Sequence, residues 1–303
     1  MEKIIICDSG GSKTVLKVLS KNGEDLKTFN CVGFGKAQDS KEELEELVSL
    51  LNQIDNKDEI IKVVVNLGGK NKEQVYTTIK NHLKGAKVLV FRESEGEVLK
   101  ALSKKHSAEI VLLAGTGAIA YASDDHKNGV VCGGWGMNIS DQGSGYDIGL
   151  SAIKRSLLEL EENKPLSMIT KKITGRERAF TLGEDFCLER DKVRANFIPL
   201  DRKKTASYAK EVLACANSGD DLSIDILKSA GEDLANQIIR TAKLVGLNKL
   251  NGVVVCGGVI NCGEFITKPL EEKVKKSLEV NKFVYDIDGV IEGVKYIALN
   301  DNN

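Results

Sequence analysis

Glycine turns and acidic side chains gather between residues 114 and 149, where the residue types suit the binding of phosphate or sugar groups. Nine of these 36 positions are glycine, in a chain of 303 residues with 29 glycines. Glycine lets the backbone adopt positive φ and approach a ligand closely. Two short turns, at 115–117 and 133–136, are followed by an acidic loop at 141–145. We therefore expect a ligand site in this stretch.

A second candidate site begins at Asp8, directly after the apolar run 3–7. The turn that follows contains Gly10, Gly11, Ser12, Lys13 and Thr14. A strand that ends in Asp and leads into a turn of backbone N–H groups, a hydroxyl and a Lys can cradle a phosphate. Asp8 would then hold a hydrated Mg²⁺. An ordinary hairpin is the alternative interpretation, because Gly and Ser are common turn residues.

The candidate residues must be positioned by strands and helices. The order of these expected elements predicts a mixed sheet flanked by helices in the first part of the chain. Expected strands are 3–7, 15–19, 26–32, 60–65, 88–91 and 110–113. One helix is expected after the capping box at Ser40 and Glu43. Two more are expected at 71–83 and at 95–105, the latter with a cap at Ser94. The glycines follow a hairpin and do not open a helix, so the sequence disfavours a nicotinamide enzyme.

A second unit is expected to begin in the glycine-rich stretch. Its predicted strands are 118–122, 129–132, 253–256 and 282–285; its predicted helices are about 146–161, 221–245, 264–278 and 288–299, with helices and loops over 165–217. The side chains expected to face inward on the helix 146–161 are Ile148, Leu150, Ile153, Leu157 and Leu158. The charged runs 176–178 and 201–204 are expected to be solvated, and the last helix is expected to pack on the first unit.

Bulk properties favour a soluble two-domain protein. The chain is 42% hydrophobic and 29% charged, and its net charge of −1 gives no sign of a nucleic-acid or membrane partner. Seven scattered cysteines favour reduced thiols over a disulfide framework. The three histidines lack a second ligand at metal-site spacing. The apolar run at the N-terminus is too short for a signal peptide, so we expect a cytoplasmic protein.

Four motifs, in order and similarly spaced, resemble those of the N-acetylglucosamine kinase family, within the actin/hexokinase-like ATPases and close to the benzoyl-CoA-reductase-activator type. They are DSGGSKT at 8–14, LAGTGAIAY at 113–121, GGWGMNISDQGSGYDIG at 133–149 and VVVCGGV at 253–259. The resemblance covers nearly the whole chain. It implies an α/β fold of two ribonuclease-H/actin-like domains with a cleft between them. The expected domains are 1–114, completed by a C-terminal helix at about 288–303, and 115–287.

The resemblance also implies transfer of the γ-phosphoryl group of MgATP to the 6-hydroxyl of a small-molecule amino sugar. Asp8 would organise Mg²⁺ and serve catalysis. ATP would be bound by Gly10, Gly11, Ser12, Lys13, Gly115, Thr116, Gly117, Gly257 and Gly258, and the sugar by Gly136, Asp141 and Gln142. The cofactors are then ATP and Mg²⁺. A homodimer is the expected form, although the motifs themselves do not define an oligomeric state.

The general base of the resembled family is an Asp at the end of the fifth strand. The family spacing from Gly115 leads to Glu95, with Glu93 as the alternative; a third interpretation makes Glu95 only a first-turn acid that suits the helix dipole. Further departures are Gln142 where the family has Glu, Ala118 where it has Ser, and Lys36 and Gln38 where it has a sugar-binding Asn. These changes bear mainly on the acceptor sugar.

Two other functions stay open. One is an ATPase that activates a radical dehydratase or reductase, which needs a cysteine-bound iron–sulfur cluster. The other is a sensor that binds sugar or nucleotide without turnover, as the departures at Glu95, Gln142 and Ala118 suggest. The GGWG and DQGSG loops favour a kinase over the activator.

Overall fold

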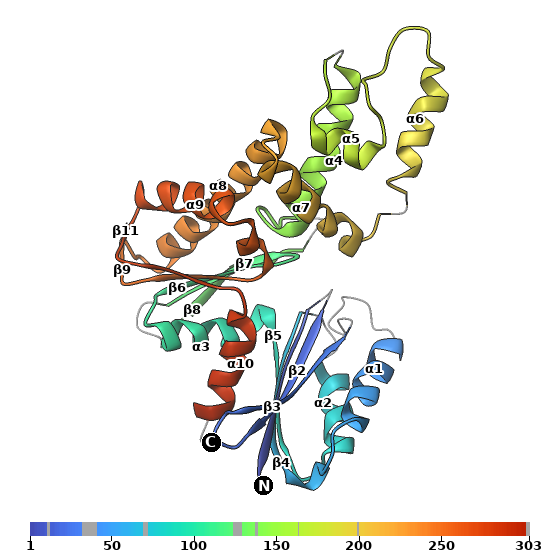
Figure 1. The fold of residues 1–303 in the computed structure, drawn as a ribbon. Helices are drawn as coiled ribbons and strands as arrows, with labels where there is room; N and C mark the ends of the chain where they lie inside the picture. The colour runs from blue at the N-terminus through green and yellow to red at the C-terminus, as the bar shows by residue number, and fades with distance from the viewer. Residues whose placement is uncertain are drawn as a thin grey trace.

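Two five-stranded sheets form the framework of the molecule (Figure 1). The computed structural model describes residues 1–10, 13–31, 41–68, 72–123, 129–136, 139–162, 164–198 and 200–300. The strand order is β3-β2-β1-β4-β5 in the first sheet and β12-β10-β6-β7-β8 in the second. In both, three consecutive antiparallel strands are extended by two strands parallel to the first of them. The two halves therefore share one topology.

The first sheet carries the predicted N-terminal motif. Its strands are β1 (Lys3–Ser9), β2 (Thr14–Ser20), β3 (Asp25–Cys31), β4 (Ile60–Leu67) and β5 (Lys87–Arg92). The apolar runs predicted as strands 3–7 and 60–65 are buried on both faces, as expected for inner strands. Helices α1 (Lys41–Asn52) and α2 (Lys72–His82) cover one face (Figure 1).

The second sheet contains β6 (Ile110–Ala114), β7 (Ala118–Ser123), β8 (Gly129–Gly133), β10 (Val253–Cys256) and β12 (Phe283–Asp286). Strands β9 (Lys249–Leu250) and β11 (Glu279–Val280) form a separate pair. The predicted domain boundary after residue 114 falls between β6 and β7, which are hydrogen-bonded neighbours in this sheet. We therefore propose a division before β6, so that both strands belong to the second half.

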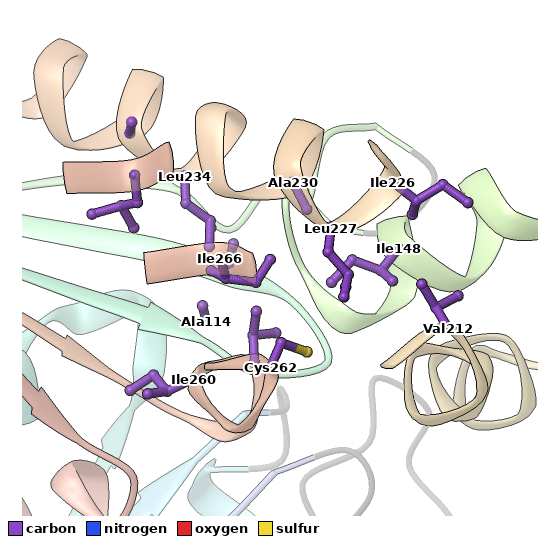
Figure 2. Packing of buried hydrophobic residues seen from close by; sticks show 14 of the residues in the cluster. Ala114, Ile148, Val212, Ile226, Leu227, Ala230, Leu234, Ile260, Cys262 and Ile266 are labelled. Carbon is purple, nitrogen blue, oxygen red and sulfur yellow. The ribbon is translucent and has the colours of Figure 1, made fainter. Parts of the chain in front are cut away.

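Helices separate and cover the two sheets (Figure 1). α3 (Glu97–His106) and α10 (Gly289–Asn300) lie between the sheets in a shared apolar cluster, so the last helix does pack on the first unit as predicted. The other face of the second sheet is covered by α4 (Gly145–Glu161), α7 (Arg202–Asn217), α8 (Asp221–Leu244) and α9 (Glu264–Lys275). Figure 2 shows Ile148 of α4, Val212 of α7 and Leu227 of α8 close together in this core.

Two smaller helices, α5 (Met168–Thr174) and α6 (Phe186–Ala195), extend outward from this layer (Figure 1). Single 3₁₀ turns occur at η1 (Lys57–Glu59), η2 (Glu93–Glu95) and η3 (Gly258–Cys262). Within the described ranges, no helix combines the length and apolar character needed to cross a bilayer.

The start of α3 differs from the prediction. Ser94 does not cap a helix that starts at 95; it lies inside η2, and Gly96 caps α3 with φ of 73°. Positive φ at this position suits glycine. The chain therefore makes a sharp break at Gly96, and Glu93 and Glu95 both lie in the single 3₁₀ turn before it.

Two predictions about exposure were wrong. Leu157 and Leu158 do not face inward: they are 37% and 60% exposed. Arg176, predicted to be solvated, has a side chain only 12% exposed and paired with Glu184 and Glu189. Both errors arise because periodicity and charge runs describe one element, whereas burial depends on which other elements cover it.

Close packing of α4 on α7 depends on Gly149. A Cβ at this position would lie 1.9 Å from the carbonyl oxygen of Thr205, closer than any real contact. We expect Gly149→Ala to lower the free energy of unfolding by about 1–3 kcal/mol, because overpacking outweighs the better helix propensity of alanine. Denaturant unfolding measures the change.

Gly85→Ala is the matched control for this variant, since a Cβ there meets no atom within 4 Å. A Gly149→Ala chain as stable as the control would show that the two helices can separate without cost.

Candidate active site

The carboxyl edge of the first sheet brings Asp8 and Glu93 to the same place. The register aligns Asp8 of β1 with Asn66 of β4, and Asn66 with Phe91 of β5; Glu93 follows two residues later. Asn66 is 3% exposed, and its Nδ2 donates to Asp8 Oδ1 at 2.9 Å. Parallel strands that end at one edge thus place two carboxyl groups around one site.

Glu93 has the electrostatic character of a proton acceptor. Desolvation is the largest cause that raises the pKa of Glu93 to about 7, although the residue keeps partial exposure. Repulsion from Asp8 and, more weakly, from Asp141 adds to the rise, whereas the positive charge of Arg202 opposes it. A general base works best with a pKa close to the operating pH.

Glu95, the first choice from sequence spacing, is held in a different set of contacts. Its carboxylate accepts from Lys72 Nζ at 2.9 and 3.0 Å and from Arg92 Nε at 3.2 Å. Desolvation disfavours its charge, but the hydrogen bonds from Lys72 and Arg92 outweigh this and lower the pKa of Glu95. Its role as base stays untested, and the geometry favours Glu93.

Asp8 supplies the carboxyl group at the start of the predicted phosphate turn. Burial raises the pKa of Asp8 to about 6, while the hydrogen bond from Asn66 and the charge of Lys13 lower it. Gly10 N donates to Lys13 O at 3.0 Å and closes the turn. The predicted ligands Gly11 and Ser12 lie outside the described residues, as do Lys36 and Gln38 of the acceptor loop.

The predicted second phosphate loop, Gly115-Thr116-Gly117, is hydrogen-bonded to the first turn of α4. Gly115 O accepts from Gly145 N at 2.8 Å, and Thr116 O accepts from Tyr146 N at 3.2 Å. A Cβ at Gly115 would meet nothing within 4 Å, so the loop backbone has open space beside it. The loop follows the first strand of its sheet, as the turn after Asp8 does in the other half.

The predicted adenosine glycines follow β10 beside this loop. Gly257 has φ of 98°, and a Cβ there would lie 2.5 Å from Ala114 O. Only glycine allows this close approach of the two strand ends. A Cβ at Gly258 would meet nothing within 4 Å. The structure therefore brings the loops at 115 and 257 together.

Asp141 is the predicted sugar ligand that follows the 133–136 loop. Its side chain is 2% exposed, and it accepts from the backbone N–H groups of Ala118 and Gly136. Desolvation raises the pKa of Asp141, whereas Arg202 and these two N–H donors lower it. The predicted sugar ligands Gly136 and Asp141 are thus adjacent. Gln142 is exposed and points to a neighbouring cavity.

That cavity has a volume of about 400 Å³ and adjoins the loop that holds Asp141. Its lining combines an aromatic, an aliphatic and a basic side chain with polar groups: Cys132, Gly133, Trp135, Ile139, Ser140, Gln142, Gln237 and Arg240. Trp135 and Ile139 are 69% and 75% exposed. Such a mixture suits the apolar and polar faces of a sugar substituent.

The prediction that 201–204 is a solvated run holds only in part for Arg202, whose side chain is 37% exposed and also contacts Asp141. Arg202 is the first residue of α7, and its Nη2 lies 3.5 Å from Asp141 Oδ2. The Asp201 N-cap, which accepts from Lys204 N at 2.6 Å, marks the helix start in the sequence. Nothing in the sequence shows that this helix start lies against Asp141.

A magnesium ion fits the donor set at Asp8. Mg²⁺ prefers oxygen ligands and keeps part of its water shell. Asp8 supplies a half-buried carboxylate, and Asn66 Oδ1 is buried with no hydrogen-bond partner among the described residues. The described part of the chain contains no group of three or more His, Cys, Asp or Glu side chains arranged for a metal.

The duplicated sheet topology, with a phosphate-type turn after the first strand of each half, defines an actin-like fold. A ROK-family glucokinase from Streptomyces griseus, solved with glucose and AMPPNP, has this fold with a TM-score of 0.64 and 14% identity over 98% of both chains. A Chromobacterium violaceum protein provisionally described as an N-acetylglucosamine kinase matches with a TM-score of 0.73 and 18% identity, over 98% of this chain and 99% of that one.

The chain belongs to the BadF/BadG/BcrA/BcrD ATPase family, whose model matches residues 7–293. A Clostridium acetobutylicum relative named N-acetylmuramic acid/N-acetylglucosamine kinase is 25% identical over 299 residues, which cover 93% of this chain and 92% of the relative. A Dictyostelium discoideum relative named N-acetyl-D-glucosamine kinase is 22% identical over 322 residues, which cover 99% and 98%.

Proposed function

We propose that this protein is an ATP-dependent kinase that phosphorylates an amino sugar of the N-acetylglucosamine type on its 6-hydroxyl. The observation that carries the proposal is the position of Glu93, which follows β5 at the same sheet edge as Asp8 and is near enough to Asp8 and Asp141 for both charges to raise its pKa. A candidate base with a raised pKa thus lies near a candidate phosphate turn and a candidate sugar ligand. Relatives named as kinases of such sugars cover nearly the whole chain.

In the proposed reaction, Asp141 holds the acceptor sugar together with Gly136 and Gln142. Glu93 accepts the proton of the attacking hydroxyl. The hydroxyl oxygen forms a bond to the γ-phosphorus, the bond between that phosphorus and the β–γ bridging oxygen breaks, and ADP leaves with its electron pair. The turns at 10–13 and 115–117 position the phosphates. Mg²⁺ at Asp8 would neutralise phosphate charge when bound.

The test is a coupled ADP-release assay with N-acetylglucosamine, glucosamine, N-acetylmuramate and glucose as acceptors. We expect sugar-dependent ADP release with at least one N-acetylated amino sugar, and a 6-phosphate in the product by NMR. ADP release that no sugar stimulates would rule out the kinase and leave an ATPase or a sensor.

The pH dependence follows from Glu93. Because its pKa is raised to about 7, the base is protonated at lower pH and competent at higher pH. Asp8 on β1 and Asp141 before α4 push this pKa up, and Arg202 on α7 pulls it down. We expect kcat/KM to fall about tenfold per pH unit below about 7. A flat profile between pH 5.5 and 8 would contradict the assignment.

A further inference from the structure

Arg202 lies where the two halves of the candidate site meet. Its Nη2 is 3.5 Å from Asp141 Oδ2, and a Cβ at Gly117 would lie only 2.8 Å from the same nitrogen. Its charge also acts on Glu93. One guanidinium group thus adjoins the second phosphate loop and the candidate sugar ligand, and it acts electrostatically on the candidate base.

The hydrogen-bonding capacity of this guanidinium is largely unused. The Nε atom of Arg202 is buried and has no hydrogen-bond partner among the described residues. Its contact with Asp141 is at the outer limit of a hydrogen bond. A guanidinium carries five N–H donors, and buried donors without acceptors are rare in proteins. The side chain is 37% exposed, so its remaining N–H donors are accessible to an acceptor with several oxygens.

A phosphoryl group in transit matches this position. Asp8, Glu93 and Asp141 are three carboxyl groups near enough to interact electrostatically, and negative charge on them opposes the approach of a phosphate. Arginine offsets such charge, and its planar fork matches two phosphate oxygens. The α7 helix start that carries Arg202 is fixed by the close packing of Thr205 on Gly149.

We propose that Arg202 is a catalytic residue that binds the transferred phosphoryl group in the transition state. The inference rests on the proposed kinase function. As the bond to ADP breaks and the bond to the sugar oxygen forms, the guanidinium donates to the equatorial oxygens of that phosphoryl group. Before ATP binds, the same guanidinium is held near Asp141, which keeps it in place.

The test compares Arg202→Lys and Arg202→Met with the unaltered chain. We expect Arg202→Met to lower kcat by at least about 100-fold, with little change in the KM for sugar, because a transition-state contact is lost. Arg202→Lys should recover part of the loss, since it restores charge without the fork. Binding of ADP with aluminium fluoride and sugar should weaken by a similar factor, while binding of ADP alone is unchanged.

Lys203→Met is the matched control: Lys203 is the next residue on α7 and is exposed. It should leave kcat and both KM values unchanged. If Arg202→Met keeps its kcat and raises only the KM for sugar, Arg202 positions Asp141 and the inference fails while the kinase stands. If the unaltered chain shows no sugar-dependent turnover, the proposed function and the inference fail together. Thermal unfolding of each variant separates these outcomes from misfolding.

Discussion

Replacing Glu93 with glutamine is expected to lower kcat by about 10²- to 10⁴-fold, the usual contribution of a general base. Glutamine has nearly the same shape but cannot accept the hydroxyl proton. ATP binding should persist, because the phosphate turns lie on other strands. Single-turnover ADP release measures the chemical step, and fluorescence titration with ATP measures binding.

Glu95→Gln is the matched control, two residues away and of identical chemistry. Its carboxylate is bound to Lys72 and Arg92, so its loss should affect mainly the turn after β5 and leave kcat near the unaltered value. The reverse result, with Glu95→Gln inactive and Glu93→Gln active, would restore the base predicted from sequence spacing. The low-pH decline should also disappear in Glu93→Gln.

The choice between these two glutamates marks the limit of what the sequence predicts. Strands 3–7 and 60–65 were predictable because short β-branched runs are typical of inner strands that are buried on both faces. The turn after β5 was not, because Ser94 and Glu97 imitate a helix cap while Gly96, with φ of 73°, ends the turn instead. A shift of two residues in the predicted spacing therefore selects Glu95, which is in an ion pair, in place of Glu93, which lies at the candidate site.

Long-range contacts account for the remaining differences between the structure predicted from the sequence and the observed one. The glycine motif at 115–117 predicted a turn, and the motif at 257–258 predicted a close backbone approach, because positions that a side chain would obstruct leave a trace in residue type. Gly257 beside Ala114 is an example. Arg202 leaves no such trace, since a basic run at a helix start is usually solvated. Its place beside Asp141 follows from α7 packing on α4, which pattern and propensity do not report.

Asp8→Asn should separate the roles of charge and shape in the phosphate turn. The amide keeps an oxygen that can accept from Asn66, but it loses the negative charge that attracts Mg²⁺. We expect the apparent affinity for Mg²⁺ in the kinase assay to fall at least about tenfold. Removing a neighbouring carboxylate should also lower the pKa of Glu93, so the low-pH decline in kcat/KM should move to lower pH.

The same substitution should make the fold more stable at neutral pH. Burial raises the pKa of Asp8 to about 6, so its charged form opposes folding once the pH rises above the unfolded value near 3.8. Removing that charge should raise the free energy of unfolding at pH 7 by on the order of 1–3 kcal/mol, toward the lower end because Asp8 keeps partial exposure. The gain should vanish at about pH 3.5.

Asp25→Asn, at an exposed ion pair with Lys17, is the control and should show no such gain. A less stable Asp8→Asn chain at pH 7 would mean that the carboxylate stabilises the folded turn, contrary to this prediction.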